Sequence, residues 1–218
     1  MNDGVITLIT QWCLLCLIWM GMFDRALGRI ALTRSHGLAV VTLFLICSYA
    51  NWQLYFLPVS INLSGAILPL LTAAWIWSAL HPQHKGFVLL AALFTTFLLF
   101  ATRKLFFWDP VLMIVDEPIL LPLIMVGTLF LLAREWRQQL VILFLSLPLA
   151  DAVYMISSFQ QWERCIIGGE YAQDLMWSIL PLWLMFALLW RIMTKGLGVF
   201  RTYLTTQLKW KTKTNANR

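Results

Sequence analysis

The chain has 218 residues, of which 61% are hydrophobic and only 12% are charged. Soluble domains carry roughly 25% charged residues, so this composition excludes a globule with a polar surface in water. The net charge of +6 does not indicate nucleic-acid binding, because the basic residues flank apolar runs and do not form one soluble basic face. The sequence therefore predicts an integral membrane protein that contacts the lipid bilayer through a single membrane domain.

Seven apolar runs are long enough to predict helices that cross a hydrocarbon core of about 30 Å. Little more than Pro58 separates the second run from the third. The fifth run holds two acids just before Pro118. Its membrane part begins either near that proline, with residues 105–115 interfacial or re-entrant, or earlier, with this stretch as part of the span. The expected fold is an all-α polytopic transmembrane bundle with a membrane domain over residues 1–193. Its predicted spans cover residues 5–23, 37–57, 59–80, 86–102, 111–133, 140–159 and 175–193.

The basic residues fall mainly in every second break between the runs. One set of breaks, together with the C-terminal residues from Arg191 onward, carries 13 Lys and Arg residues, and the opposite set carries three. Cytoplasmic segments of membrane proteins carry the excess of Lys and Arg. The pattern therefore predicts an outside N-terminus, a cytoplasmic C-terminus and a multi-pass protein of the plasma membrane.

The C-terminal segment 194–218 is strongly basic. Between Gly196 and Lys211, apolar residues fall on one side of a helix and basic residues lie among the intervening positions. This pattern is typical of an amphipathic helix that binds anionic lipid at the inner leaflet. The alternative is a continuation of the seventh helix whose charges only set the topology.

Asp151 is the one ionisable residue well inside a predicted span. At a rise of about 1.5 Å per residue it lies about 16 Å from the cytoplasmic edge. A carboxylate at that depth costs roughly 2.5–3.5 kcal/mol on insertion scales, so we expect it to face the bundle. Tyr154 and Ser158 follow on the same helical face. The stripe indicates a proton, cation or ligand site, or alternatively an interhelical hydrogen bond that fixes packing.

Other polar residues lie at a similar predicted depth, in the outer half of the bilayer. Asn51 lies about 21 Å along the second helix from the inner side, and Gln11 about 9 Å from the outer side of the first. We therefore hypothesise an outward-opening polar cleft lined by Gln11, Asn51, Asp151 and Tyr154. The alternative is scattered hydrogen bonding between helices.

A charged segment follows the fourth predicted span on the outer side. It contains Arg103, Lys104, Asp109, Asp116 and Glu117, with aromatic residues between them. Ion pairs such as Arg103 with Asp109 or Asp116 would give it a structural role. A re-entrant element that guards a cleft is the functional alternative.

No motif in the sequence assigns a reaction. Cys13 and Cys16 lie inside an apolar run, and only Cys165 lies in an outer loop, where we expect it to react with reagents from outside. Buried small residues therefore explain the pair better than redox chemistry. No histidine lies in a span, and no phosphate-binding loop or zinc-protease motif occurs. We expect no catalytic residues, no metal and no cofactor.

The segment Phe107-Trp108-Asp109-Pro110-Val111, just after a span that ends in basic residues, resembles a motif of the YphA-like membrane proteins. These are small multi-span proteins of spore-forming Gram-positive bacteria, and the spacing of their spans is similar. The resemblance implies a bacterial plasma membrane and transfers no activity.

Two functional hypotheses follow. The first is a module that binds or transports a small molecule or ion through a cleft around Asp151. The second is a structural or assembly protein that contacts a protein partner through its helix faces and its basic C-terminal segment.

Overall fold

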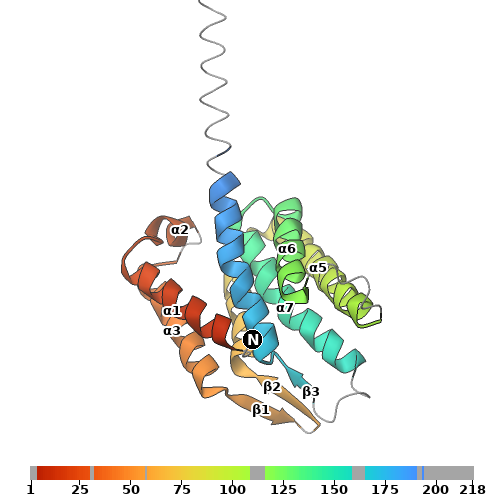
Figure 1. The fold of residues 1–218 in the computed structure, drawn as a ribbon. Coiled ribbons are helices and arrows are strands. Elements are labelled where there is room, and N and C mark those ends of the chain that lie inside the picture. The colour runs from red at the N-terminus through yellow and green to blue at the C-terminus, as the bar shows by residue number, and fades with distance from the viewer. Residues whose placement is uncertain are drawn as a thin grey trace, which may run out of the picture. The chain divides into compact units, whose positions relative to one another are not determined.

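The computed structural model describes residues 4–29, 32–56, 58–108, 116–158, 165–190 and 193 (Figure 1). Met1–Leu180 form one compact unit, and Pro181–Arg218 form a second. Most described residues are helical, as expected. The elements are α1 (Val5–Trp19), α2 (Asp24–Arg29), α3 (Arg34–Ala50), β1 (Gln53–Phe56), β2 (Val59–Asn62), the π-helix η1 (Leu63–Ile67), α4 (Leu68–Ser78), α5 (Pro82–Trp108), α6 (Glu117–Leu132), α7 (Trp136–Ser157), β3 (Cys165–Ile167) and the helix Glu170–Trp190.

Three of the described helices are long and apolar enough to cross a membrane, namely α5, α7 and the helix Glu170–Trp190. Four shorter apolar helices accompany them: α1, α3, α6 and Leu63–Ser78, which combines η1 and α4. Each of the seven apolar runs of the sequence contains one of these helices. The helix of the sixth run, α7, begins and ends earlier than expected. Because it ends at Ser157, Asp151 lies about 9 Å from that end at the helical rise per residue.

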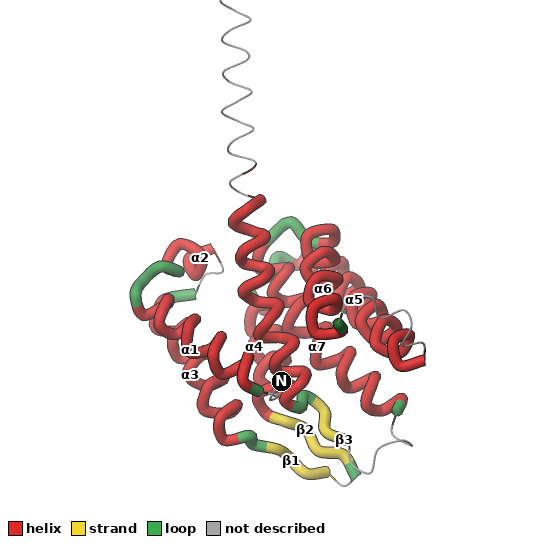
Figure 2. The backbone as a smooth tube through the Cα atoms, in the orientation of Figure 1, coloured by secondary structure: helices red, strands yellow, loops and turns green. Residues whose placement is uncertain are grey.

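The main difference from the expected all-α fold is a three-stranded sheet, drawn in yellow in Figure 2. Strand β1 pairs antiparallel with β2, and β2 pairs parallel with β3. The strands β1 and β2 occupy positions that hydropathy assigned to the second and third spans. Asn51 ends α3 in the left-handed conformation, with φ at 46°, and the residues that follow are rich in aromatic and β-branched side chains, which favour strands. A short apolar run does not by itself distinguish strand from helix.

The sheet brings two distant connections together at one end of the first unit. Strands β1 and β2 join α3 to α4, whereas β3 lies between α7 and the helix Glu170–Trp190. We call this end the sheet end. Helix α7 packs against both α4 and α5, and α1 packs against α3 (Figure 1). The ends of these helices are therefore held by backbone pairing between the connections.

The first turn of α1 is capped by a side chain from another helix. Gly4 is in the left-handed conformation and offers no side-chain cap. Asp174, in the helix Glu170–Trp190, accepts hydrogen bonds from the backbone N–H groups of Gly4 and Thr7, both at 2.8 Å, and from Thr7 Oγ1 at 2.6 Å. A carboxylate also suits the partial positive charge of a helix N-terminus. The contact fixes α1 at the sheet end.

The π-helix η1 begins at a capped position and packs against a neighbouring backbone. Asn62 Oδ1 accepts hydrogen bonds from the N–H groups of Ser64 and Gly65, at 2.9 and 3.2 Å. A Cβ atom on Gly65 would lie 2.0 Å from the carbonyl oxygen of Gly168. Gly168 itself has φ at +72°, a conformation that glycine adopts without strain. Only glycine at position 65 allows the two backbones to approach this closely.

In the second unit, the described residues up to Trp190 continue the helix Glu170–Trp190. The predicted basic segment 194–218 lies outside the described residues, as does the segment 109–115. Residues 105–108, which we expected to be interfacial or re-entrant, form the last turn of α5.

We expect Gly65→Ala to lower the free energy of unfolding by about 1–3 kcal/mol, the usual cost of overpacking a dense contact. The matched control is Gly127→Ala in α6, where a Cβ atom would meet nothing within 4 Å. That control should change stability by less than about 1 kcal/mol. Thermal unfolding of both variants in the same detergent measures the difference, and equal melting temperatures would contradict the close contact.

Candidate binding site

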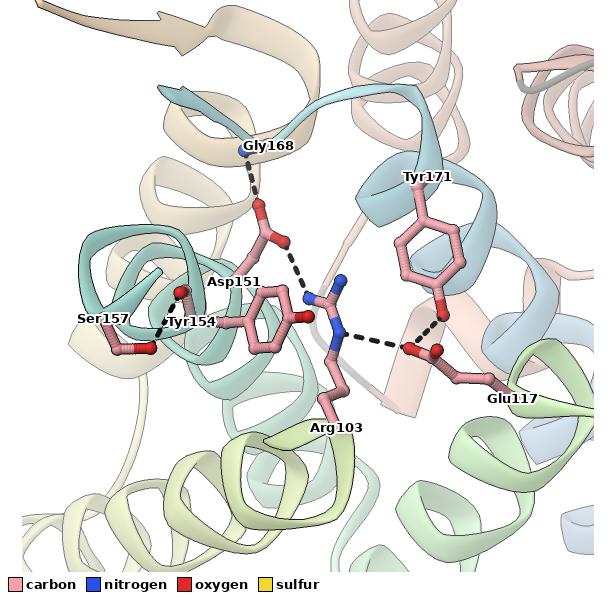
Figure 3. A network of polar contacts seen from close by, with 7 residues as sticks. All are labelled: Arg103, Glu117, Asp151, Tyr154, Ser157, Gly168 and Tyr171. Atoms are coloured by element: carbon pink, nitrogen blue, oxygen red, sulfur yellow. Dashed lines mark hydrogen bonds and ion pairs between the residues drawn. The ribbon is translucent and has the colours of Figure 1, made fainter. Parts of the chain in front are cut away.

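The guanidinium of Arg103 is a largely buried charge near the sheet end of α5 (Figure 3). Its Nη1 lies 2.9 Å from Asp151 Oδ1 on α7, and its Nε lies 3.2 Å from Glu117 Oε1 at the start of α6. The Arg103 and Asp151 side chains are only 10% and 4% exposed. Hydrogen-bonded pairing of this kind is what allows charges to be buried.

Two tyrosine rings contact the same guanidinium. Its Cζ atom lies 4.1 Å from the centroid of the Tyr154 ring and 4.9 Å from that of Tyr171. Arginine over an aromatic face gains a cation–π attraction that grows when water is excluded. The Tyr171 hydroxyl donates to Glu117 Oε1 at 2.7 Å. Figure 3 shows Tyr171 and Glu117 side by side, with Arg103 between them and Asp151.

Asp151 is not the lone carboxylate that the sequence suggested. Its Oδ1 accepts from Arg103, and its Oδ2 accepts from the backbone N–H of Gly168 at 2.8 Å. The carboxylate therefore faces the bundle, as expected. The conformation of Gly168 that brings this N–H into place depends on the contact with Gly65 described above.

We call Arg103, Glu117, Asp151, Tyr154 and Tyr171 the Arg103 cluster. When all its acids are ionised, it holds two carboxylates and one guanidinium, and so an excess of one negative charge. The neighbouring Lys104 is directed elsewhere: its Nζ lies 3.3 Å from Ser158 Oγ and 5.7 Å from the centroid of the Phe107 ring.

A small cavity adjoins the cluster. Its volume is about 10 Å³, roughly the room that one water molecule needs. Arg103 and Asp151 form its polar wall, and the remaining lining is apolar side chains together with Gly65. A cavity of this size has room for about one water-sized occupant.

The four residues of the hypothesised cleft fall into separate groups. Asp151 and Tyr154 both contact Arg103. Gln11 is fully buried and donates to Ser48 Oγ at 3.0 Å. Asn51 is exposed, accepts from Asn62 Nδ2 at 2.7 Å and lies near Glu170. Neither Gln11 nor Asn51 lines the cavity beside Asp151.

The residues of the predicted charged segment 103–117 also fall into separate groups, and Arg103 and Lys104 lie within α5. Arg103 pairs with Glu117 and Asp151, and among the described residues it forms no ion pair with Asp116. Asp116 precedes α6 without a side-chain cap bond, and Asp109 lies outside the described residues. The site also includes Tyr171 and Gly168, which the sequence analysis missed. The only signal for them in the sequence was the pair Gly168-Gly169 followed by Glu170 and Tyr171 at the start of a helix.

Cys165 differs from the expected accessible thiol. It lies in β3 paired with Val59 and is 1% exposed, because this end of the strand packs against the bundle. Burial raises the pKa of its thiol, and the negative charge of Asp151 raises it further. Since the thiolate is the reactive form, Cys165 is a poor reporter of sidedness at neutral pH.

Comparison with known proteins gives one match. The family model described as YphA-like integral membrane protein matches residues 3–213. No curated protein and no solved structure matches. The three long apolar helices agree with a protein that spans a membrane.

Arg103→Gln removes the guanidinium of the cluster and leaves the buried Asp151 and the partly exposed Glu117 without it. Breaking a buried pair in this way costs about 3–5 kcal/mol. Lys104→Gln is the matched control, because its half-buried amine contacts one hydroxyl and should cost about 1 kcal/mol or less. Denaturant unfolding in detergent compares the two variants, and equal losses would show that the pairing does not stabilise the bundle.

Proposed function

The chain belongs to the YphA-like integral membrane protein family, and we propose that it binds or transports a small cation at the Arg103 cluster. The cation is a monovalent metal ion or a proton, and it enters from the outer face of the plasma membrane. The observation that carries this proposal is the charge balance of the cluster, in which two carboxylates share one guanidinium.

Excess negative charge is costly where water is scarce. The Coulomb energy between two charges at a given distance is several-fold larger near a protein surface than in bulk water, and it is larger still in the protein interior. Neutralisation by protonation of an acid, or by a bound cation, removes this cost. Ionisable groups within membrane helices are in addition functional candidates by default.

Packing alone gives a weaker account of the same residues. Well-packed apolar side chains of similar volume often replace a buried ion pair with no loss of stability. A purely structural joint between α5, α6 and α7 would therefore not require an unbalanced charge. The imbalance is the feature that favours ion binding over a structural role.

The exposure of the charged groups falls steadily towards the cavity. The Glu117 side chain is 25% exposed, that of Arg103 is 10% exposed and that of Asp151 is 4% exposed. A cation that arrives at the sheet end thus meets Glu117 first and the cavity beside Asp151 last. We assign Glu117 to capture of the ion and Asp151 to the inner site.

We further propose that the chain crosses the membrane seven times with the sheet end outside. The distribution of basic residues supports this orientation, because segments at the sheet end carry few Lys and Arg. The start of α1 lies at the same end through its contacts with Asp174. An outside N-terminus follows.

Single cysteines test this orientation. Tyr55→Cys in β1 replaces a residue that is 76% exposed, and Glu135→Cys replaces an exposed residue between α6 and α7. In a background with Cys13→Ser and Cys16→Ser, an impermeant maleimide added to whole cells should label the cysteine at position 55 and not the one at position 135. Labelling of position 135 from outside, or none at position 55 until the cells are broken, would overturn the orientation.

Ion binding is tested on purified protein in lipid nanodiscs. Ligands that bind the folded state raise its apparent stability. We expect the melting temperature to rise when choline is replaced by sodium, potassium or lithium at constant ionic strength. If the occupant is a proton, the melting temperature instead changes with pH and not with the metal ion.

Glu117→Gln should abolish the response to the cation or proton. Glu170→Gln, which removes an exposed acid near the same end of the bundle, should leave it intact. A wild-type protein that responds to neither metal ions nor pH contradicts the proposal, as does an unchanged response in Glu117→Gln.

A further inference from the structure

Two polar atoms deep in the bundle lack hydrogen-bond partners in the described part of the chain. They are Oε1 of Gln11, on α1, and Nε1 of Trp177, in the helix Glu170–Trp190. Gln11 is 0% exposed and Trp177 is 2% exposed. A buried polar group without a partner costs about 1–3 kcal/mol. One of these atoms is an acceptor and the other is a donor, so a single partner can satisfy both.

The contacts at the end of α1 bring the two side chains to the same level. Thr7 bonds Asp174, and both helices run away from the sheet end from that point. Gln11 follows Thr7 by four residues, and Trp177 follows Asp174 by three. Residues at these spacings share a helical face. Gln11 and Trp177 therefore both face the interface that Thr7 and Asp174 form, about one helical turn deeper.

A second set of contacts, through α3, gives the same placement. The Trp177 ring meets Phe44 edge-on, with ring centroids 5.3 Å apart. Ser48 lies one turn after Phe44 on the same face of α3, and its Oγ accepts from Gln11 Nε2 at 3.0 Å. Trp177 and Gln11 thus flank the same stretch of α3.

Polar groups lead from the surface to this point. Asn51 and Glu170 are exposed at the sheet end, and Asn51 accepts from the fully buried Asn62. Asn62 caps the backbone of η1 at Ser64, and the Ser64 hydroxyl contacts Ser48. From the exposed Asn51 amide to the buried Gln11 amide, each of these side chains is uncharged and forms hydrogen bonds.

From these observations we propose that Gln11 and Trp177 hold one buried water molecule at the bottom of this second polar path. The water accepts from Trp177 Nε1 and donates to Gln11 Oε1. Buried waters of this kind make two to four hydrogen bonds to groups that would otherwise be unpaired. A neutral molecule that both accepts and donates fits the pair, because one of the two atoms is an acceptor and the other a donor.

This site is distinct from the Arg103 cluster. The contact between Gly65 and Gly168 separates them: Ser64, just before Gly65, belongs to the neutral path, while the N–H of Gly168 bonds Asp151. The bound water does not depend on ion binding. Asp151→Asn is therefore a control that should leave it in place.

The experiment is nuclear magnetic resonance of the full chain in nanodiscs, with the tryptophan indole nitrogens labelled. Trp177→Phe identifies the Trp177 indole resonance by its loss. In the wild-type protein we expect an Overhauser contact between that indole proton and a long-lived water. Ser48→Ala should retain the contact, which excludes a relay through the Ser48 hydroxyl.

Gln11→Met, which keeps the volume and removes the acceptor, should abolish the water contact. Gln11→Glu, which keeps an acceptor oxygen, should preserve the water contact. This variant also serves as a control if Gln11→Met fails to fold. The proposal is overturned if the wild-type indole shows no bound water. It is also overturned if Gln11→Met keeps the contact, or if the indole bonds Gln11 directly without a water signal.

Discussion

The structure depends on one constraint, namely that a guanidinium placed among apolar helices must be fully paired. Arg103 meets it with carboxylates from two other helices and with two aromatic rings. Its partners come from α6, α7 and the helix Glu170–Trp190. Because each partner contacts the same guanidinium, the sheet ends of four helices are held close to one another. Polar contacts of this kind add to van der Waals packing in holding membrane helices together.

The sheet follows from the same constraint. The second oxygen of Asp151 needs a donor, and the backbone N–H of Gly168 supplies it. That N–H reaches Asp151 because the chain after β3 turns through a positive φ and lies directly against η1 at Gly65. Pairing of β3 with β2 then holds the connection in place. The strands, the two glycines and the buried carboxylate thus form one joint at the sheet end.

The sequence predicted the helices better than it predicted the site. Long apolar runs specify helices through their length, and all seven runs contain one. The runs did not reveal the strands, because hydrophobicity over a few residues is compatible with either structure. Asp151 and Arg103 were both singled out, but their pairing joins residues that are 48 positions apart. Such a contact depends on helix packing, which a single sequence does not encode locally. The hypothesised cleft separated into two networks for the same reason.

The two networks differ in the kind of molecule that each can stabilise. The Arg103 cluster carries formal charges, so an ion gains Coulomb energy there that exceeds what neutral dipoles provide. The path from Asn51 to Gln11 offers amide, hydroxyl and indole groups, which can donate to and accept from a neutral molecule. The backbone contact at Gly65 lies between them and has no room for a side chain. The proposed water site and the proposed ion site therefore lie on opposite sides of this contact.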